Sequence, residues 1–566
     1  MYKKLVIVVL AAAMLLSSCG ANTPTTEDSK AETEKVDSTK ADEKTDEKTD
    51  VKDDETKEIK EITFISRVDA TVEDTVLANL DGESMEDNRW TQRIAEETGY
   101  QIVYKWIVRD EDQFKQKLNA ALASGDIPDI MSLDNVQLKQ AIDADLLADM
   151  GDVFDKHASP LLKGIIEEAG SAPIQAATVD GVQYGIPVID ADAEMSFLLW
   201  LRTDWLEEAD LTAPSTIDEL IEVAKAFKEI AGEGGYGLGV EKDPFGRRTV
   251  FHLEGLFNAF GAYPEYWMED ESGDLVYGNT TEEFREALGV VADMYQLGLI
   301  DQEFTVKDGG KVAEDVVAGK IGMYYGPHWT PGWPLQDNVN NDPDADWKPF
   351  AIPTVDGSDP RPGAELATTQ WYVASAASEY PEALVEIMSL YCDLIFDQDK
   401  QEFEHYSAAP GADGGTIPTW RLSPIFQYTV NKNINIAEQI KPHLESGDPG
   451  DLFGESLSTF ENTYAAMNGD RANWSAMRIF GIGGASEMQG EYWNKNLLNM
   501  NKFFGSSTET MITHKTILDN AFDEAVLKVI TGQQSLEEFD QSVQAWFDGG
   551  GTAITEEVNA WYAENK

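Results

Sequence analysis

The sequence predicts an α/β protein that folds into at least two lobes. Its 566 residues exceed the length that one hydrophobic core usually serves, about 250–300 residues. Hydrophobic residues make up 42% of the chain, enough to fill more than one core. The first folded stretch also alternates strand and helix patterns, an order typical of a parallel sheet covered by helices. Ligands of such sheets bind beyond the carboxyl ends of the strands.

The first five expected elements follow the order β-α-β-α-β. They are a strand at 59–68, a helix around Trp90 that ends at Gly99, a strand at 100–108, a helix at 113–123 and a strand after Asp129. A glycine directly after a helical pattern is a common helix end. This order is the basis for expecting a parallel sheet at the start of the folded chain.

The following segments continue the mixed pattern. We expect helices at 136–150, 153–168, 281–297 and 312–318, a turn and strand at 180–187, and strands at 197–201 and 371–374. Thr216 and Glu219 form a capping box that starts another helix. Pro381 fits the first turn of a helix that runs to Leu394. After this helix the chain is expected to be mainly helical, with breaks at 409–418 and 479–489. Segment 322–334 places aromatic residues among prolines and glycines and is expected to be a loop.

The N-terminus has the layout of a secretory signal peptide. Lys3 and Lys4 precede an apolar run at 5–16, which is shorter than the roughly 20 residues of a membrane-spanning helix. The ending Leu16-Ser17-Ser18-Cys19 resembles a bacterial lipobox, whose cysteine receives a diacylglyceryl group. Two acyl chains suffice for a stable anchor. We expect a signal peptide at 1–18, and the alternative is an ordinary cleaved signal in which Cys19 is incidental.

Residues 19–58 are expected to be a disordered, charged tether behind the lipidated cysteine. The segment mixes Lys, Asp, Glu, Thr and Ser and contains few large apolar residues, so it cannot bury enough surface to fold. The chain would then be anchored by lipid to the extracellular face of a membrane, in a Gram-positive cell.

The charge of the chain argues against several partners. It carries 43 Lys and Arg against 103 Asp and Glu, a formal net charge of −60. Such a surface repels nucleic acid and anionic lipid, so we expect no nucleic-acid partner and membrane contact only through the anchor. The simplest reason for the charge is solubility after export.

Few residues suggest chemistry or metal binding. Beyond Cys19, the sole cysteine is Cys392, which lies in an apolar pattern and is expected to be a buried small hydrophobe. The alternative is a nucleophile. The six histidines show no ligand spacing such as HExxH, so we expect no zinc, no cofactor and no catalytic residue.

Seven segments in order resemble a known family. They are SGDIPDI, DGVQYGIPV, LWLRTDWLEEADL, STIDELIEVAKAFKEI, AGKIGMYYGPHWTPGWP, YPEALVEIM and FDQSVQAWFDGGGTAITEEVNAWY. They are similar to extracellular solute-binding proteins of ABC importers, family 1, including the LipO/LplA-like lipoproteins of Firmicutes. The resemblance implies a two-lobed α/β fold of the type II periplasmic-binding-protein kind, with an interlobe hinge and a ligand cleft. It further implies a monomer that captures a sugar or oligosaccharide by hinge closure and delivers it to a permease.

This resemblance leads to a first division into lobes. The N-terminal lobe is expected to contain 59–189 and about 327–405, and the C-terminal lobe about 190–326 and 406–566. Related large binders often carry an EF-hand-like calcium loop after the helix that here reads AFKEI. In 230–237 only Glu233 could be a ligand, so we expect that this chain has lost the calcium site.

A sugar site needs aromatic faces for C–H surfaces and polar groups for hydroxyls. The candidates are Asp129, Asp190, Asp192, Glu194, Trp200, Arg202, Trp267, Tyr325, Trp329, Trp333 and Trp371, with Trp420, Arg421 and Arg478 as weaker ones. Each has an alternative interpretation. Asp129 would stabilise a turn, the acidic residues at 190–194 would be solvated, Trp200 would belong to the core, and Arg202 would pair with Asp204.

Two other functions use the same features. A binder of peptide or another small solute could have the same fold, because a fold does not fix the ligand. A secreted glycoside hydrolase would need two carboxyl groups about 5–10 Å apart. The sequence has no isolated motif that marks an acid and a nucleophile.

Overall fold

The first strands form the expected parallel pair. In the computed structural model, β1 (Lys60–Arg67) pairs in parallel with β2 (Tyr100–Val108). Between them α1 (Arg89–Thr98) begins at Asn88, whose side chain caps the helix, and ends at Gly99 with φ of 81°. This left-handed conformation favours glycine, which confirms the predicted helix end.

The structure describes residues 60–69, 72–189, 193–245, 249–365, 368–397, 402–411 and 416–565. The predicted signal peptide, Cys19 and the tether lie outside these ranges, as do Asp190 and Asp192. Statements about the whole structure below refer to the described residues.

The third strand does not continue the parallel pairing. β3 (Ile130–Leu133) pairs antiparallel with β13 (Trp371–Ala374), and β13 also pairs antiparallel with β6 (Ile186–Pro187). The prediction of a parallel sheet is therefore right for β1 and β2 and wrong for β3. A strand from much later in the chain supplies the backbone partner, and local periodicity cannot reveal this.

The second sheet has β7 (Leu198–Arg202) at its centre. β10 (Met323–Gly326) and β11 (Trp347–Phe350) flank it, both antiparallel. β10 corrects the prediction of a loop at 322–334. All four of its residues are buried, and a buried segment must pair its backbone groups. The chain becomes irregular only after Gly326, and Trp333 has an extended backbone conformation within Pro331–Leu335.

The strand pairing leads us to propose lobe boundaries that differ from the expected ones. β11 pairs with β7, whereas β13 pairs with β3, so the chain crosses back between residues 350 and 371. Buried residues up to Val430 also pack in the core that contains Ile62 and Phe64. We therefore propose that 60–189 and about 371–430 form the first lobe. A separate core joins residues 197–352 to 511–558.

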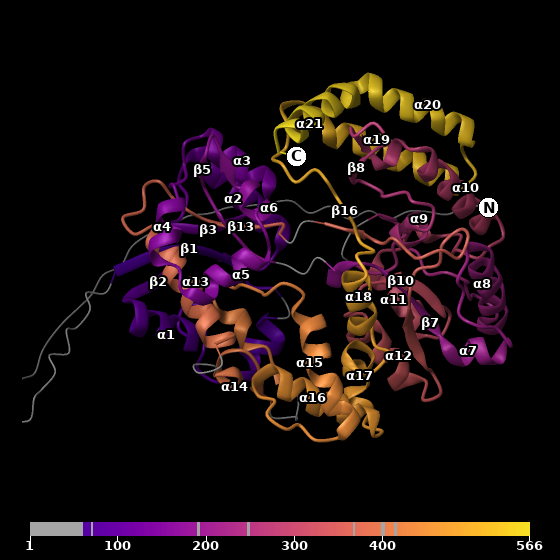
Figure 1. Cartoon of the computed structure of the whole chain (residues 1–566), viewed down its shortest axis with the longest axis horizontal. Helices are drawn as coiled ribbons and strands as arrows, with labels where there is room; N and C mark the ends of the chain where they lie inside the picture. The colour runs from indigo at the N-terminus through magenta and orange to yellow at the C-terminus, as the bar shows by residue number, and fades with distance from the viewer. Residues whose placement is uncertain are drawn as a thin grey trace, which may run out of the picture. The chain divides into compact units, whose positions relative to one another are not determined.

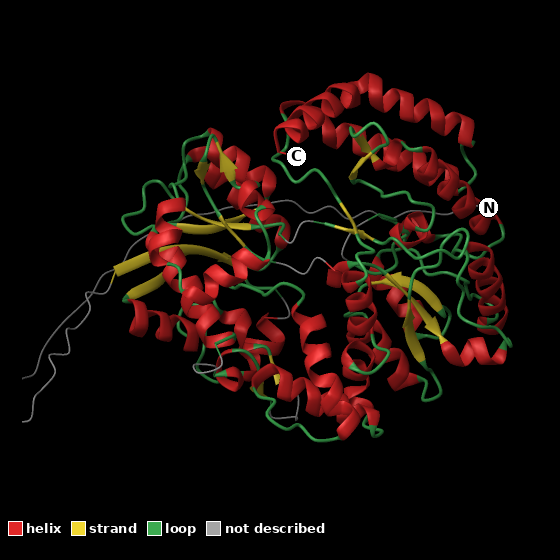
Figure 2. Cartoon of the chain, in the orientation of Figure 1, coloured by secondary structure: helices red, strands yellow, loops and turns green. Residues whose placement is uncertain are grey.

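Helices surround both groups of strands, joined by long loops (Figures 1 and 2). The longer ones are α2 (Glu111–Ser124), α3 (Asn135–Asp143), α5 (Pro160–Glu168), α8 (Ile217–Ala231), α10 (Glu282–Gln296), α11 (Gly309–Val317), α13 (Glu382–Ile395), α15 (Lys432–Ser446), α16 (Gly454–Met467), α18 (Ala485–Asn494), α19 (Glu509–Ile530), α20 (Leu536–Trp546) and α21 (Thr552–Asn565). The shorter ones are α4 (Gly151–His157), α6 (Ala172–Gln175), α7 (Thr203–Glu208), α9 (Glu254–Asn258), α12 (Gln336–Asn341), α14 (Phe403–Tyr406) and α17 (Trp474–Phe480). The remaining strands are β4 (Thr178–Val179), β5 (Val182–Gln183), β8 (Trp267–Glu269), β9 (Leu275–Tyr277), β12 (Gly363–Ala364), β14 (Ala409–Pro410), β15 (Thr416–Ile417) and β16 (Asn499–Met500).

Several helix boundaries test the sequence patterns. The capping box that starts α8 is present, with Thr216 and Glu219 each bonding the other's backbone. The helix expected at 153–168 is instead divided into α4 and α5. Pro160 lacks an N–H group and occupies the first turn of α5, where that group is not needed. The helix expected at 136–150 ends at Asp143, and the expected break at 479–489 ends where α18 begins.

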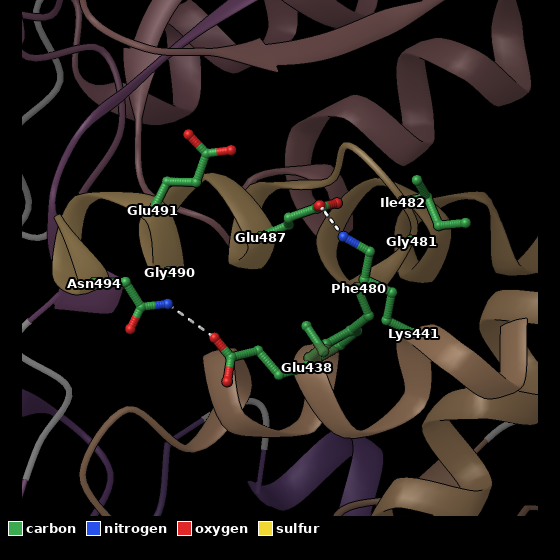
Figure 3. A pocket seen from close by; sticks show the side chains of 10 residues that line it. Glu438, Lys441, Phe480, Gly481, Ile482, Glu487, Gly490, Glu491 and Asn494 are labelled. Carbon is green, nitrogen blue, oxygen red and sulfur yellow. Dashed lines mark hydrogen bonds and ion pairs between the residues drawn. The ribbon is translucent and has the colours of Figure 1, made fainter. Parts of the chain in front are cut away.

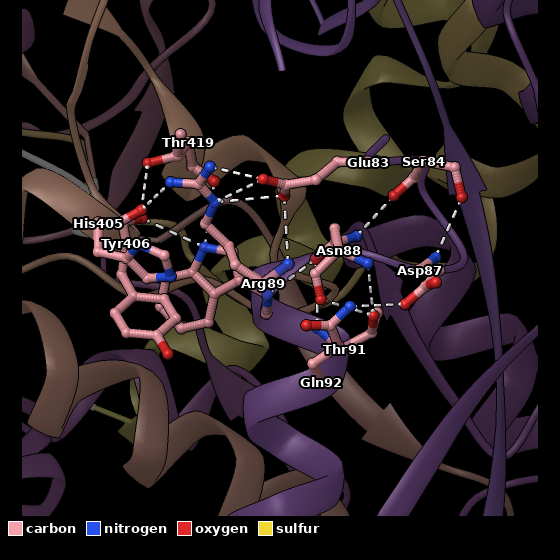
Figure 4. A network of polar contacts seen from close by, with 11 residues as sticks. Glu83, Ser84, Asp87, Asn88, Arg89, Thr91, Gln92, His405, Tyr406 and Thr419 are labelled. Atoms are coloured by element: carbon pink, nitrogen blue, oxygen red, sulfur yellow. Dashed lines mark hydrogen bonds and ion pairs between the residues drawn. The ribbon is translucent and has the colours of Figure 1, made fainter. Parts of the chain in front are cut away.

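A polar network fixes His405, Tyr406 and Thr419 to α1 (Figure 4). Arg89 donates a hydrogen bond from Nη1 to the carbonyl oxygen of His405 at 2.6 Å. Trp90 Nε1 donates to the carbonyl oxygens of Tyr406 and Thr419 at 3.2 and 3.1 Å. The network therefore holds a late segment of the chain beside the first strands.

Two further findings concern Cys392 and the helices of the described residues. Cys392 is buried, which confirms the expected small hydrophobe, and burial raises the pKa of its thiol. A buried thiol with a raised pKa makes a poor nucleophile. No helix in the described ranges has both the length and the apolar composition needed to cross a membrane.

Trp371 provides a stability test of this core. Its side chain is 2% exposed, and its Nε1 donates to the carbonyl oxygen of Pro173 at 2.8 Å. We expect Trp371→Ala to lower the free energy of unfolding by about 3–5 kcal/mol, because it leaves a large cavity. Trp333→Ala, at a residue that is 42% exposed, should cost less than about 1 kcal/mol. Urea denaturation followed by circular dichroism measures both, and equal losses would contradict the assignment of Trp371 to the core.

Candidate functional site

The first candidate cavity has a volume of about 400 Å³ and is built from five separate segments. We call it the Glu194 cavity. Its lining residues are Val188, Glu194, Met195, His328, Thr369, Gln370, Phe426, Tyr428, Thr429, Lys432 and Asn433. These residues follow β6 and β10, precede β7 and β13, and lead into α15, so most of them lie at the ends of elements.

Glu194 organises the polar wall of this cavity. Its carboxylate, in a side chain only 2% exposed, accepts hydrogen bonds from the backbone N–H groups of Asn433 and Ile434, the latter at 3.1 Å. It also accepts one from Asn433 Nδ2 at 2.7 Å. These N–H groups belong to the first turn of α15, whose own preceding residue, Asn431, makes no side-chain cap. The negative charge of Glu194 thus caps α15 and complements the helix dipole.

His328 and Gln489 hold Glu194 in place from its backbone. The ring nitrogen Nδ1 of His328 donates to the carbonyl oxygen of Glu194 at 2.7 Å, and Gln489 Nε2 donates to the same oxygen at 2.8 Å. With Nδ1 protonated, His328 Nε2 can accept the hydrogen bond from Asn433 Nδ2 at 3.2 Å. The wall is therefore preorganised before any ligand arrives.

The second cavity has a volume of about 430 Å³ and borders the first. We call it the Arg67 cavity. Gln370 and Phe426 line both cavities, so the two meet at these residues. Its other walls come from the end of β1, the first turns of α2 and α3, and the segment at 420–426.

Aromatic side chains form a continuous floor under both cavities. The ring of Phe426 lies 6.0 Å from Trp420 and 5.7 Å from Tyr428, measured between centroids. All three are half-buried, so each keeps part of its surface toward solvent. An apolar floor with a few fixed polar groups is the usual design of a small-molecule site.

The structure brings only part of the predicted set to these cavities. Among the described candidates, Glu194 lines the Glu194 cavity, and the weaker candidates Trp420 and Arg421 line the Arg67 cavity. Trp329 is half-buried against a core and Trp333 is 42% exposed, but neither lines a cavity described here.

Four of the predicted aromatic residues lie in the core. They are Trp200, Trp267, Tyr325 and Trp371, all at most 4% exposed. Trp200 Nε1 donates to the carbonyl oxygen of Gly326 at 3.2 Å, and burial raises the pKa of the Tyr325 hydroxyl. A ring enclosed by other side chains cannot stack on a ligand, so we leave these residues out of the proposed site.

The remaining polar candidates have structural partners. Asp129 accepts hydrogen bonds from the N–H and hydroxyl groups of Thr63, at 2.9 and 2.5 Å, and so ties β1 to β3. Arg202 donates from Nε to Asp204 Oδ1 at 2.7 Å and from Nη2 to Asp342 Oδ2 at 2.9 Å. Arg478 pairs with Asp346. The turn and ion-pair alternatives fit these positions better than ligand binding.

Sequence reasoning missed Phe426, Tyr428 and Gln370. The first two show an alternating pattern that could have been detected. Along 425–428, buried and cavity-lining residues alternate: Ile425 and Gln427 are buried, whereas Phe426 and Tyr428 line the cavities. This is the two-residue period of an extended chain. Gln370 precedes β13 and carries no distinctive signal.

A third cavity, of about 260 Å³, lies between α15 and α18 (Figure 3). Its polar side chains bind one another. Lys441 pairs with Glu487 at 2.5 Å, and Asn494 Nδ2 donates to Glu438 at 3.1 Å. Few polar groups remain for a ligand, so we do not include this cavity in the candidate site.

The described residues contain no group of three or more His, Cys, Asp or Glu side chains placed to hold a metal ion. Residues 230–237, the segment compared above with a calcium loop, begin with the last two residues of α8, which ends at Ala231 with Gly232 as its C-cap. The loss of the calcium site stays a prediction from the sequence.

Sequence comparison places much of the chain in one family. Residues 82–390 match the family model described as bacterial extracellular solute-binding protein. Lipoprotein LipO of Bacillus subtilis is 30% identical over 234 residues, 40% of this chain and 44% of LipO. The fructooligosaccharide ABC transporter substrate-binding protein FusA of Streptococcus pneumoniae is 28% identical over 255 residues, 41% of this chain and 45% of FusA. The matched parts span less than half the length of these two relatives.

Comparison of structures confirms the fold class. An extracellular solute-binding protein from Bifidobacterium longum subsp. infantis superposes with a TM-score of 0.63 at 17% identity, covering 89% of this chain and 98% of that one. FusA in complex with kestose gives a TM-score of 0.59 at 16% identity, covering 90% and 100%. Such neighbours are two-lobed periplasmic solute-binding proteins, so the two-lobed α/β prediction is confirmed.

The cap on α15 gives a prediction for Glu194. Glu194→Gln removes the charge and, with its remaining oxygen on the two backbone N–H groups, sets an NH₂ group against Asn433 Nδ2. We expect it to lower the free energy of unfolding by about 1–3 kcal/mol. Glu445→Gln, an exposed position on the same helix, should change it by less than about 0.5 kcal/mol. Urea denaturation measures the free energy of unfolding of both variants. If Glu194→Gln lowers it as little as Glu445→Gln does, the cap does not stabilise α15.

Proposed function

The chain belongs to the bacterial extracellular solute-binding proteins, and from this premise we propose that it captures a sugar or oligosaccharide for an ABC importer. The observation that carries the proposal is the pair of adjoining cavities with one aromatic floor. Aromatic rings cover the C–H faces of a sugar, and Gln370 and Lys432 offer groups that bind hydroxyls, Lys432 while it is paired with Glu455. The name of FusA, a fructooligosaccharide binder, supports the same ligand class.

We propose binding by hinge closure, without covalent chemistry. The Glu194 cavity draws its walls from both sides of the lobe boundary proposed above, with Val188 and Phe426 on one side and His328 on the other. A ligand that contacts both sides binds the closed form more tightly than the open form and therefore shifts the equilibrium toward closure. A permease that recognises the closed form would then accept only the loaded protein.

The proposed location is the outer face of a membrane, through a lipid on Cys19. The lipobox and the charged tether in the sequence support this, as does the name of the relative Lipoprotein LipO. The tether would let the folded part search for solute while the anchor keeps it beside the permease. The chain would act as a monomer.

Cys19→Ala tests the anchor. We expect the variant to be released from the membrane fraction into the medium of a Gram-positive host, because the thioether to lipid cannot form. Immunoblotting of the two fractions measures this, with Cys392→Ala as the matched control that should remain bound. Retention of both variants in the membrane would contradict a lipid anchor at Cys19.

Phe426→Ala tests the site. A thermal-shift screen of oligosaccharides, with peptides as the competing class, first identifies a ligand, because binding stabilises the folded state by mass action. We then expect Phe426→Ala to weaken binding about tenfold or more, since both cavities lose part of their floor. Trp333→Ala, outside both cavities, should leave the affinity unchanged in calorimetry. Stabilisation by peptides alone would replace the sugar with the competing ligand class.

A further inference from the structure

The Arg67 cavity contains two arginines whose donors are unused. The side chains of Arg67 and Arg421 line it and are 36% and 35% exposed. Within the described residues, neither guanidinium group donates a hydrogen bond to the protein. Each lies 3.8 Å from the same atom, Asp69 Oδ2, which is beyond hydrogen-bond distance. Arg67 also lies 3.7 Å from Glu111.

The nearby carboxylates are already occupied by stronger partners. Glu111 pairs with Lys115 at 2.8 Å, and Asp134 accepts the N–H of Gln137 at 2.8 Å as the cap of α3. Asp69 Oδ1 accepts the N–H of Val72 at 2.9 Å. Arg67 therefore faces Asp69 Oδ2 and Glu111 Oε2, and Arg421 faces Asp69 Oδ2, all beyond hydrogen-bond distance. The lining balances its formal charges, with Arg67, Lys115 and Arg421 against Asp69, Glu111 and Asp134, in a chain whose formal net charge is −60.

Rigid neighbours hold both arginines in position. The guanidinium of Arg421 lies 5.0 Å from the ring centroid of Trp420, a cation–π contact that limits its movement. Thr419, which precedes Trp420, accepts a hydrogen bond from Trp90 Nε1 through its carbonyl oxygen, and it belongs to the network in Figure 4. Arg67 is the last residue of β1, which is paired along its length with β2.

We infer that the Arg67 cavity binds the carboxylate of an acidic saccharide unit between Arg67 and Arg421. This inference rests on the proposed function and narrows its ligand to an acidic oligosaccharide. A guanidinium group presents a planar fork of donors that matches a carboxylate and is only weakly hydrated. The neighbouring unit of the ligand would extend past Gln370 and Phe426 into the Glu194 cavity. Asp69 acts as a positioning residue that draws the two guanidinium groups together.

The experiment compares acids with their neutral esters on the full-length chain. The probes are trimers of galacturonate, mannuronate and glucuronate, the methyl ester of each, and the corresponding neutral hexose trimers. We expect isothermal titration calorimetry to show at least one acid binding about tenfold or more tightly than its ester, since each charge-assisted hydrogen bond contributes strongly. The difference in affinity between acid and ester should shrink when NaCl is raised from about 50 to about 500 mM. This change shortens the Debye length, roughly 10 Å at 0.1 M salt, several-fold, so salt screens the partly exposed charges.

Arginine variants locate the effect. Arg67→Gln and Arg421→Gln should each remove most of the difference between acid and ester, while the melting temperature of the ligand-free protein stays unchanged. Arg109→Gln, an exposed arginine that does not line the cavity, is the matched control and should keep the full difference. The comparison on the unsubstituted chain decides the proposal even where a variant fails to fold.

Two results would overturn the inference, and they have different meanings. If neutral trimers or esters bind as tightly as the acids, the acidic ligand is wrong while sugar binding stands. If no saccharide of any class binds, the proposed function itself fails. An acid preference that persists in both arginine variants would also overturn it, because the carboxylate would then lie elsewhere.

Discussion

The hydrogen bonds between Glu194 and the first turn of α15 are the interaction on which the candidate site depends. A helix N-terminus leaves backbone N–H groups without partners, and Asn431 does not supply the missing acceptor. Glu194, more than 230 residues earlier in the chain, supplies it. The same contact joins the segment that leaves the first lobe to the helix that follows the aromatic floor. His328 and Gln489 complete the arrangement by bonding the backbone of Glu194.

A second constraint fixes the aromatic floor itself. Trp420, Phe426 and Tyr428 lie on a segment with little regular structure, which would be mobile if it were unsupported. α1 holds the start of this segment through Trp90, whose Nε1 donates to the carbonyl oxygen of Thr419. The buried side chain of Gln427 holds its end by donating to the carbonyl oxygen of Pro187 at 2.8 Å. Short polar contacts from regular elements thus replace secondary structure in positioning the site.

These two constraints explain why the binding surface combines opposite properties. The Glu194 cavity has a wall that its own hydrogen bonds make rigid, and Gln370 and Lys432 beside this wall supply the groups that can bind neutral hydroxyls. The Arg67 cavity instead keeps donors unused beside an aromatic face. A ligand lying across both would meet a fixed polar wall at one end and a charged pair at the other. Selectivity then comes from groups that an unsuitable ligand would leave without partners.

The sequence by itself determined the order and type of most elements, the family and the burial of Cys392. The capping box at Thr216, the glycine after α1 and apolar periodicity are local signals, and local signals can be recognised in the sequence alone. They also predicted Glu194, Trp420 and Arg421 among the candidates, but could not separate them from Trp200, Trp267, Tyr325 and Trp371. An aromatic residue has the same appearance in sequence whether it fills a core or faces a cavity. Only the tertiary structure decided that β13 lies between β3 and β6 and runs antiparallel to both. The same holds for the burial of β10 as a strand and for the aromatic floor that Phe426 and Tyr428 form. The physical reason is the same in each case: pairing and burial depend on residues far apart in the chain, and no local pattern records which of them meet.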